Sequence, residues 1–492
     1  MLLGIDIGTS ACKTTILDSS TGHIVATVRH PLNYLYPDSV RAEIDAEDLW
    51  HSVKSVLRQM SAQYPKEVAA LKAAAVSIVF PTLLPLSADN TPLCKAILYN
   101  HRRSQPQVDE INRRLGLKTV ERITGNTLTP GTSILPGILW LKQNMPEITK
   151  KTKTYATLGT FIIHRLTGVI GMDPAHASLS ALCPMGREHE WSDELLQAVG
   201  ITAEQLPIVH EGLSIAGTLK PEVAKETGLP ADLPIVWTNG DSVLSAFGAG
   251  VAFPGQVFAA CGSTDNIIVC ADRPSGNPIF CNVRHILPDV WSATGSMSAA
   301  GASVKWLCES LLQCSVDAAM ADAKNAAAGC GGLVFLPYLL GERTPVWDAN
   351  ARGVFLGLSL ATGRAEATRA VLEGVACAWR QMLELLEKEF DFRPAEIVTA
   401  GGGSTNHLWN QIKATMLNRP LIVLDFNDVG SLGACLTAGL GSGIFKTPQE
   451  AFALTTPLRN SHIVEPVPEW KDALDSAFDR YNQLYPAVKH LF

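Results

Sequence analysis

A short strand–turn–strand unit that occurs twice constrains this chain more than any other feature. Residues Ile5 to Leu17 have the pattern of an apolar strand, a Gly8-Thr9-Ser10 break and a second, β-branched strand. Residues 257–270 repeat that pattern around Gly262-Ser263-Thr264. One such turn is common, but two in the same setting, one in each half, indicate a duplicated α/β domain.

The length of the chain agrees with two copies. Its 492 residues exceed what one hydrophobic core usually serves, and 47% hydrophobic residues argue against disorder. Small residues cluster after Asp241, around Ala246 to Pro254. We therefore predict an N-terminal domain over 1–245 and a C-terminal domain over 246–492.

Charge and cysteine usage exclude several classes of partner. The net charge is -7, and no run is rich in Lys and Arg, so a nucleic-acid partner is not expected. The 11 cysteines form no CxxC pair, which favours buried thiols in a reducing compartment over disulfides or zinc. No secretory signal or bilayer-spanning stretch is evident, so we expect a soluble cytoplasmic protein without a membrane partner.

Helix and strand signals place the later motifs. Asp45 is suited to cap a helix over Ala46 to Met60, and Ala365 to Glu387 carries a buried stripe at helical spacing. Glu396 to Ala400 reads as a strand that runs into Gly401-Gly402-Gly403-Ser404, with a helix from about Asn406. Three glycines would let a flat adenine ring pack on bare backbone; the alternative is a tight turn with a helix cap.

The glycine–hydroxyl turns are typical of anion binding, because bare backbone can approach a phosphate closely. Neither a GxxxxGK[ST] loop nor protein-kinase motifs are present. Asp6 precedes the first turn and Lys13 follows it. Asp6 is either a turn-capping carboxylate or a Mg²⁺ ligand, and the cost of an unpaired acid in an apolar strand favours the metal.

Asp241 is the candidate general base. It follows an apolar strand, Leu233 to Trp237, and a predicted turn, Thr238-Asn239-Gly240. We expect it near an interdomain cleft, where one carboxylate would take the proton of an acceptor hydroxyl. The alternative is a helix N-cap.

Taken together, these segments resemble the FGGY carbohydrate kinases, closest to the xylulokinase-like branch, over nearly the whole length. The segments that carry the resemblance are 4–10, 123–126, 239–242, 262–264, 335–345, 353–358, 369–374 and 401–403. The run Leu336-Pro-Tyr-Leu-Leu-Gly-Glu-Arg-Thr-Pro345 is the most specific of them.

The resemblance implies two actin-like, RNase H-type ATPase domains around a central cleft, with ATP and Mg²⁺ as cofactors, a sugar held mainly by the first domain, and a possible homodimer. It implies Asp241 as general base, and Asp6 with Asp241 near the metal. The residues that it implies for the nucleotide are Gly8, Thr9, Ser10, Lys13, Gly262, Ser263, Thr264, Gly301, Lys305, Gly402, Gly403 and Asn406. It also implies that Glu342 to Pro345 braces the site.

The sugar side departs from the family pattern. Ser77-Ile78-Val79-Phe80-Pro81 stands where xylulokinases usually carry Gln-Met-His-Gly-Ala, Tyr99-Asn100-His101 replaces Trp-Asn-Asp, and Gly137 replaces a common lysine. Substrate contacts are expected from Val79, Phe80, Asn100, His101 and Asp241. His101 is either a substitute sugar ligand or a surface-loop histidine. Because a site rejects analogues through its polar groups, we hypothesise a substrate other than D-xylulose, or a pentulose held by different contacts.

Two rival functions remain beside the kinase. One is a catalytically silent sensor that binds sugar or nucleotide, although retention of Asp6, Asp241 and both turns favours an enzyme. Release of ADP on addition of a sugar separates the two. An actin- or chaperone-like ATPase shares the expected fold but does not account for the segment Gly341 to Pro345.

Overall fold

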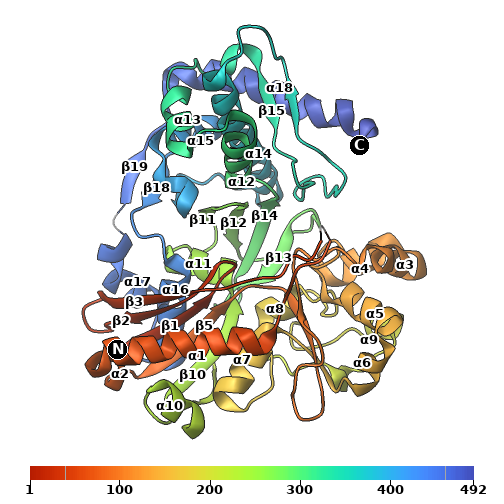
Figure 1. Cartoon of the computed structure of the whole chain (residues 1–492), viewed down its shortest axis with the longest axis vertical. Helices are drawn as coiled ribbons and strands as arrows, with labels where there is room; N and C mark the ends of the chain where they lie inside the picture. Colours follow the sequence, from red (N-terminus) through yellow and green to blue (C-terminus); the bar gives the residue numbers. More distant parts are fainter. Residues whose placement is uncertain (39, 460) are drawn as a thin grey trace. The chain divides into compact units, whose positions relative to one another are not determined.

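The computed structural model describes residues 1–38, 40–459 and 461–492. The chain forms two compact α/β units (Figure 1). Unit 1 comprises Met1–Ala252, Asp272–Ser292 and Asp428–Arg459; unit 2 comprises Phe253–Ala271, Ala293–Asn427 and Asn460–Phe492. The chain thus enters unit 1 again twice after leaving it. The single boundary after residue 245 stays a prediction about domains, distinct from this geometric division.

The main sheet of unit 1 has the strand order β3-β2-β1-β5-β10-β9. Strand β1 runs antiparallel to β2 and parallel to β5, and β10 runs parallel to β5 and antiparallel to β9. The bounds are β1 Leu2–Ile7, β2 Ala11–Leu17, β3 Ile24–Pro31, β5 Ala73–Ile78, β9 Ile215–Thr218 and β10 Pro234–Gly240.

Strand β1 is buried on both faces, which explains its almost unbroken apolar sequence. Leu3, Ile5 and Ile7 belong to the core that includes the buried side chains of α1 (Ala46–Gln63). Gly4 lies on the opposite face against α16 (Val429–Gly441), where a Cβ would come within 2.2 Å of the Ser431 carbonyl oxygen. Because side chains alternate along a strand, Asp6 lies on this second face.

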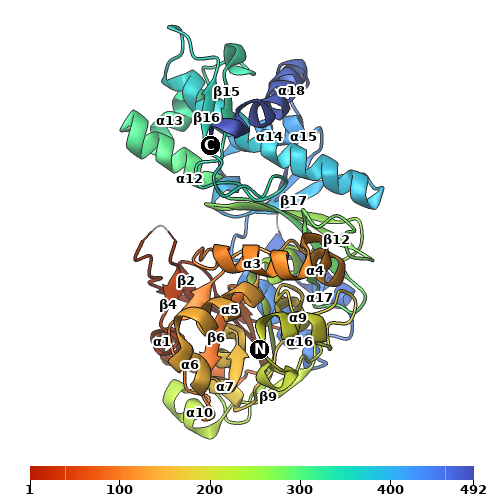
Figure 2. The ribbon, with the colours of Figure 1, turned by 90° about the vertical axis from the view of Figure 1, so that its right-hand side faces the viewer.

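The rest of unit 1 is a smaller sheet, with order β4-β7-β6-β8, and a group of helices (Figure 2). The strands are β4 Glu43–Ile44, β6 Thr82–Leu86, β7 Ala96–Leu98 and β8 Thr154–Ala156. The remaining helices are α2 Pro65–Ala69, α3 Gln105–Leu115, α4 Leu117–Thr124, α5 Ile134–Asn144, α6 Pro146–Lys151, α7 Leu158–Thr167, α8 Pro174–Ser178, α9 Asp193–Val199, α10 Pro221–Thr227, α11 Asp241–Gly248 and α17 Pro448–Leu454.

The sheet that contains β11 has seven strands, in the order β13-β14-β12-β11-β17-β18-β19, and β13 is Cys281–Arg284. Strand β11 runs antiparallel to β12 and parallel to β17, β18 runs parallel to β17, and β19 is antiparallel to β18. The bounds are β11 Val257–Cys261, β12 Asp265–Ala271, β14 Trp291–Met297, β17 Ile397–Ala400, β18 Leu421–Leu424 and β19 Ser461–Val464, with a hairpin of β15 Val334–Leu336 and β16 Val354–Leu356. The strands β12-β11-β17-β18 repeat the order and directions of β2-β1-β5-β10, which confirms the duplicated domain.

Helices pack around this second sheet. They are α12 Gly301–Trp306, α13 Val316–Ala323, α14 Arg364–Phe390, α15 His407–Leu417 and α18 Lys471–Val488. The expected stripe on α14 is confirmed, because Val371, Val375 and Trp379 are fully buried. The expected helix start at Asp45 is confirmed as well, since its carboxylate accepts the backbone N–H of Glu47 at 2.9 Å.

One local prediction is wrong. Thr238-Asn239-Gly240 is not a turn, because β10 continues through these residues to Gly240. Asn239 and Gly240 pair with Ser77 and Ile78 of β5 after a register shift. The glycine and asparagine signals of a turn are overridden by pairing with a buried neighbouring strand.

In the part of the chain that the structure describes, all 11 cysteines are free thiols. The same residues include no helix long and apolar enough to cross a bilayer.

Candidate active site

The first glycine turn joins β1 to β2 in unit 1. The Gly8 amide donates to the Ala11 carbonyl at 3.1 Å, and the Tyr34 hydroxyl donates to the Gly8 carbonyl at 2.8 Å. Thr9 and Ser10 are exposed at its tip. Their hydroxyls are therefore accessible to an anion, and the role of this turn in phosphate binding stays a prediction.

Asp6, near the end of β1, is only 8% exposed. One carboxylate oxygen accepts the Ser77 hydroxyl at 2.7 Å, and the other lies 3.9 Å from Lys13 Nζ. The turn amides do not contact it, so the turn-capping interpretation is not supported. Burial raises the pKa of Asp6, and the Lys13 charge and the Ser77 hydrogen bond only partly oppose this.

The N-terminus of α16 lies beside Asp6. A Cβ at Gly430 would stand 3.2 Å from both Asp6 oxygens, so the glycine permits this approach. Asp428, at the start of the helix, accepts Lys13 Nζ at 2.8 Å and Arg29 at 3.2 Å. Lys13 thus shares its charge between two carboxylates, and a helix N-terminus favours negative charge here. The sequence analysis missed Asp428, which lies far along the chain from Asp6.

Asp241 is the first residue of α11, with Gly240 at the cap position. Burial, together with the charge of Asp6, raises the pKa of Asp241 to about 7, against the backbone N–H of Ser242 and the charge of His176, which lower it. A carboxylate with that pKa is suited to accept a proton near neutral pH. The structure therefore brings Asp6 and Asp241 within electrostatic range of each other.

The predicted acceptor-side residues differ in their surroundings. Val79 is 1% exposed and packs in the main core of unit 1. The Phe80 ring covers Gly240, where a Cβ would come within 2.2 Å of it. Asn100 keeps a buried side-chain oxygen without a hydrogen-bond partner among the described residues. Asn100 is therefore the member of this set with a free polar group to offer.

His101 is not a surface-loop histidine, and that interpretation is wrong. Its side chain is 1% exposed, Nε2 accepts Arg103 Nε at 2.7 Å, and Nδ1 lies 3.2 Å from the backbone N and O of Ala42. Burial and the Arg103 charge lower the pKa of His101. Both ring nitrogens are thus engaged, and a role as sugar ligand stays a prediction without a free nitrogen to support it.

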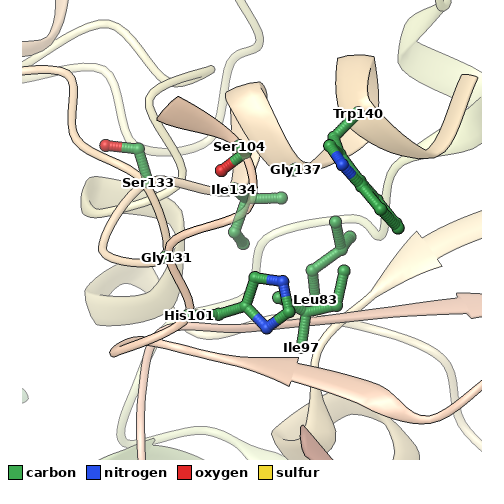
Figure 3. Close-up of a pocket in the computed structure, with 9 residues that line it drawn as sticks. All are labelled: Leu83, Ile97, His101, Ser104, Gly131, Ser133, Ile134, Gly137 and Trp140. Atoms are coloured by element: carbon green, nitrogen blue, oxygen red, sulfur yellow. The ribbon is translucent and has the colours of Figure 1, made fainter. Parts of the chain in front are cut away.

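A small cavity adjoins His101 (Figure 3). His101 and Trp140 lie on its walls, and Gly137 of α5 contributes only backbone. A Cβ at Gly137 would come within 2.9 Å of Leu83, so a lysine here would displace its neighbour. The cavity measures about 10 Å³, room for about one water molecule, which is too small for a sugar.

The second glycine turn, in unit 2, is held differently. The Gly262 amide donates to the Asp265 carboxylate at 2.9 Å, and the Gly301 amide donates to the Gly262 carbonyl at 3.1 Å. A Cβ at Gly301 would lie 2.5 Å from that carbonyl oxygen, so this helix start requires glycine. Ser263 is exposed and Thr264 partly so. Lys305, further along α12, has a 69% exposed side chain near Glu309.

The triple glycine follows β17, the parallel neighbour of β11. Gly401 has a φ of +116°, and a Cβ there would lie 2.2 Å from the Cys261 carbonyl oxygen. A Cβ at Gly402 would meet nothing within 4 Å, so this glycine borders open space. Asn406, rather than a glycine, caps α15 by accepting the Trp409 amide at 2.9 Å. Apart from Lys305, the predicted nucleotide residues of unit 2 therefore lie at the ends of β11 and β17 or in the segments that begin there.

Beneath the second turn lies a buried cluster that the sequence analysis missed. Asp265 accepts Trp379 Nε1 at 2.9 Å and lies 3.5 Å from the fully buried Lys413. The Lys413 ammonium stands 4.0 and 4.1 Å from the ring centroids of Trp379 and Trp409. This cluster fixes the carboxylate that holds the Gly262 amide.

The bracing role expected for residues 342–345 has direct contacts in unit 2. Glu342 accepts the Ser298 and Arg343 amides at 2.7 and 2.8 Å, and Arg343 donates to the Met297 carbonyl. The Thr344 hydroxyl accepts the Ser296 amide at 3.1 Å. These bonds tie the segment to the end of β14.

The residues present fit magnesium-bound ATP. Among the residues that the structure describes, no three His, Cys, Asp or Glu side chains form a metal cage. Mg²⁺ needs none, because it is commonly held by one or two carboxylates together with phosphate and water oxygens. In unit 1, two neighbouring acids with raised pKa, Asp6 and Asp241, are such a pair. In unit 2, taken by itself, the open space beside Gly402 suits a flat ring.

Two α/β units whose four central strands share one order and one set of directions, each with a glycine turn after its first strand, define the actin-like ATPase class of fold. The N-terminal domain of the FGGY family of carbohydrate kinases matches residues 1–248, and its C-terminal domain matches residues 259–442. The chain belongs to this family, whose members use ATP with Mg²⁺, and is an ATP-dependent carbohydrate kinase.

Individual relatives agree over the full length. A xylulose kinase of Escherichia coli (strain K12) is 29% identical and covers 94% of this chain and 94% of its own. One from Bacillus subtilis (strain 168) is also 29% identical, over 100% of this chain and 97% of its own. The crystal structure of a xyloylose kinase from Brucella ovis superposes with a TM-score of 0.92 at 28% identity, over 100% of both chains.

Proposed function

We propose that this kinase transfers the γ-phosphoryl group of ATP to a hydroxyl of a ketose or related polyol, with Asp241 as the general base. The observation that carries the proposal is the position of Asp241 at the start of α11, with its pKa raised to about 7. A base is most effective when its pKa lies near the working pH.

In the proposed reaction, Asp241 accepts the proton of the acceptor's hydroxyl group. The oxygen of that hydroxyl bonds to the γ-phosphorus of ATP, and the bond between the γ-phosphorus and the ADP oxygen breaks. Asp6 and Asp241 are the carboxylates that would hold Mg²⁺, which neutralises phosphate charge when bound. Lys13, fixed by Asp428, adds a positive charge at the first turn. Exposed backbone and hydroxyls of residues 8–10 and 262–264 would bind the phosphates.

The nature of the acceptor follows from relatives and from the departures near β5. The relatives are named xylulose kinases, which supports a ketose. Val79, however, places an apolar side chain where the family pattern has a histidine, and Phe80 adds a ring where it has a glycine, and this favours a substrate other than D-xylulose.

The test is ADP release by the purified protein with ATP, Mg²⁺ and a panel of ketoses, aldoses, polyols and sugar acids. We expect turnover with at least one ketose or polyol, and weaker turnover of D-xylulose. Best turnover of D-xylulose would reject the altered specificity. No ADP release with any acceptor, despite measurable nucleotide binding, would instead support the silent sensor. The cytoplasmic location and the homodimer stay predictions.

A further inference from the structure

A buried histidine of unit 1 lies beside the proposed acceptor site. His176 belongs to α8 and has no exposed surface. Asp173, just before α8, uses one oxygen to accept the Ala175 and His176 amides, at 3.0 and 3.1 Å. Its other oxygen accepts the Thr238 hydroxyl at 2.9 Å and lies 2.7 Å from His176 Nδ1. Asp173 thus ties the imidazole to strand β10.

The contact with Asp173 fixes which nitrogen of His176 carries the proton. Nδ1 lies 2.7 Å from an Asp173 oxygen in a geometry too bent to count as a hydrogen bond, and because two acceptor atoms that close would repel each other, we place the ring proton on Nδ1. In the neutral ring, Nε2 then presents a lone pair. Nε2 is buried and has no hydrogen-bond partner among the described residues. A buried acceptor without a partner is unusual in a folded protein and requires an explanation.

The surroundings of the ring connect it to Asp241. The ring of His176 lies 5.3 Å from that of Phe80, centroid to centroid, and Phe80 in turn covers Gly240. Gly159 of α7 leaves bare backbone next to the Nε2 edge, since a Cβ there would stand 3.4 Å from Nε2. His176 is among the groups that affect the pKa of Asp241, so the two side chains lie near each other. Val79, Phe80 and Pro81 offer no side-chain polar group nearby.

We propose that His176 is a specificity-determining residue of the acceptor site, with Nε2 accepting a hydrogen bond from a substrate hydroxyl held beside Asp241. This inference rests on the proposed function and names what the site recognises. The substrate must present a hydroxyl to Nε2, because a lone pair attracts a donor and repels a carboxylate. Polyols and ketoses are therefore accepted, and acids that carry a carboxylate at this position are rejected.

Two substitutions distinguish the contribution of Nδ1 from that of Nε2. His176→Asn keeps an amide near Asp173 but removes the group at Nε2, whereas His176→Gln extends a polar atom toward the Nε2 position. We expect His176→Asn to lower kcat/KM for the best acceptor by about 10- to 100-fold, mainly through KM, as for loss of one buried hydrogen bond. The KM for ATP should stay within about twofold, and His176→Gln should recover part of the loss.

A matched control is His164→Asn, in the last turn of α7, where Nδ1 is also buried without a partner among the described residues. This change should leave acceptor KM unaltered. Monodeoxy analogues of the best acceptor sharpen the test. One of these analogues should bind the wild type more weakly than the parent acceptor does, but should bind His176→Asn as well as the parent acceptor does. The reason is that it lacks the hydroxyl that donates a hydrogen bond to Nε2.

Calorimetric binding of the acceptor in the presence of ADP keeps this proposal separate from the kinase proposal. If the wild type binds acceptors without turnover, the kinase proposal fails, while weaker binding to His176→Asn still supports His176. Unchanged acceptor affinity and selectivity in His176→Asn would overturn the inference. A variant that loses thermal stability and turns over all acceptors equally poorly would also overturn it, because such a residue is only structural.

Discussion

The two glycine turns have the same strand setting but hold their first amide in different ways. In unit 1 the Gly8 amide donates to a backbone carbonyl, that of Ala11, at 3.1 Å. In unit 2 the Gly262 amide donates to the Asp265 carboxylate at 2.9 Å. The first turn therefore leaves its neighbouring acid, Asp6, free for other chemistry, whereas the second uses its acid for structure.

The acids beside the two turns, Asp6 in unit 1 and Asp265 in unit 2, also differ in their electrostatic surroundings. Asp265 is 1% exposed and saturated by Gly262, Trp379 and Lys413. Asp6 shares one lysine with Asp428 and lies close enough to Asp241 to raise its pKa. The two copies therefore differ: unit 1 has two buried carboxylates with raised pKa, Asp6 and Asp241, whereas in unit 2 the acid beside the turn is occupied by structural contacts. The predictions below test this contrast.

The largest effect is expected from Asp241→Asn. Loss of a general base usually costs about 10²- to 10⁴-fold, so kcat for sugar phosphorylation should fall at least 100-fold. Affinity for ADP, measured by calorimetry, should change less than about threefold, because this carboxylate does not bind the nucleotide base. Activity within tenfold of the wild type would remove Asp241 from the proposed mechanism.

Asp265→Asn should chiefly affect folding. It leaves the buried Lys413 charge without its carboxylate, and breaking a buried ion pair from one side costs about 3–5 kcal/mol. Denaturant unfolding monitored by tryptophan fluorescence measures this loss. Asp6→Asn is the matched control in unit 1, and because Lys13 keeps Asp428 as its partner at 2.8 Å, it should destabilise the protein less than Asp265→Asn does while lowering activity. Equal destabilisation by both variants would contradict the claim that only the acid beside the second turn has a mainly structural role.

The triple glycine offers a pair of neighbouring tests. Gly401→Ala forces a side chain into a positive φ and against the Cys261 carbonyl, so it should destabilise unit 2 by about 1–3 kcal/mol. Gly402→Ala meets no protein atom within 4 Å and should leave the melting temperature unchanged. If Gly402 borders adenine, as the family resemblance implies, the KM for ATP should rise several-fold. An unchanged KM for ATP would remove Gly402 from the nucleotide site.

The smallest effect is a shift with pH. Asp241 binds its proton more tightly in the folded protein, where its pKa is about 7, than in the unfolded chain, where its pKa is near 3.8. The stability that this proton contributes is present at low pH and is lost as pH rises through about 7. Asp241→Asn should therefore raise the melting temperature by a few degrees at pH 8 and by less at pH 5, in calorimetry. In the wild type, kcat/KM should fall as pH drops below about 7, because the base becomes protonated.

Local patterns located much of the site. The apolar strands, the glycine–hydroxyl turns and Asp6 were predicted from the sequence because strand periodicity and turn chemistry act over a few residues. The helix over Ala46 to Met60 and its Asp45 cap were predicted for the same reason. Asp173-Pro174 also carries a helix-start signal that would have located α8.

Other features depend on contacts between distant residues. No local sequence pattern indicates that His101 and His176 are buried. Tertiary packing buries His101 against Arg103 and His176 against Phe80. The continuation of β10 through Gly240 required β5 as its partner.

The sequence by itself therefore determined the duplicated α/β design, the two turns and the acids near them, because each is encoded within a short segment. Only the tertiary structure decided how those acids behave. Asp428 contacts Lys13, more than 400 residues away in the sequence, and Lys413 contacts Asp265, 148 residues away. The pKa of a carboxylate depends on burial and on nearby charges, and both are properties of the packed molecule.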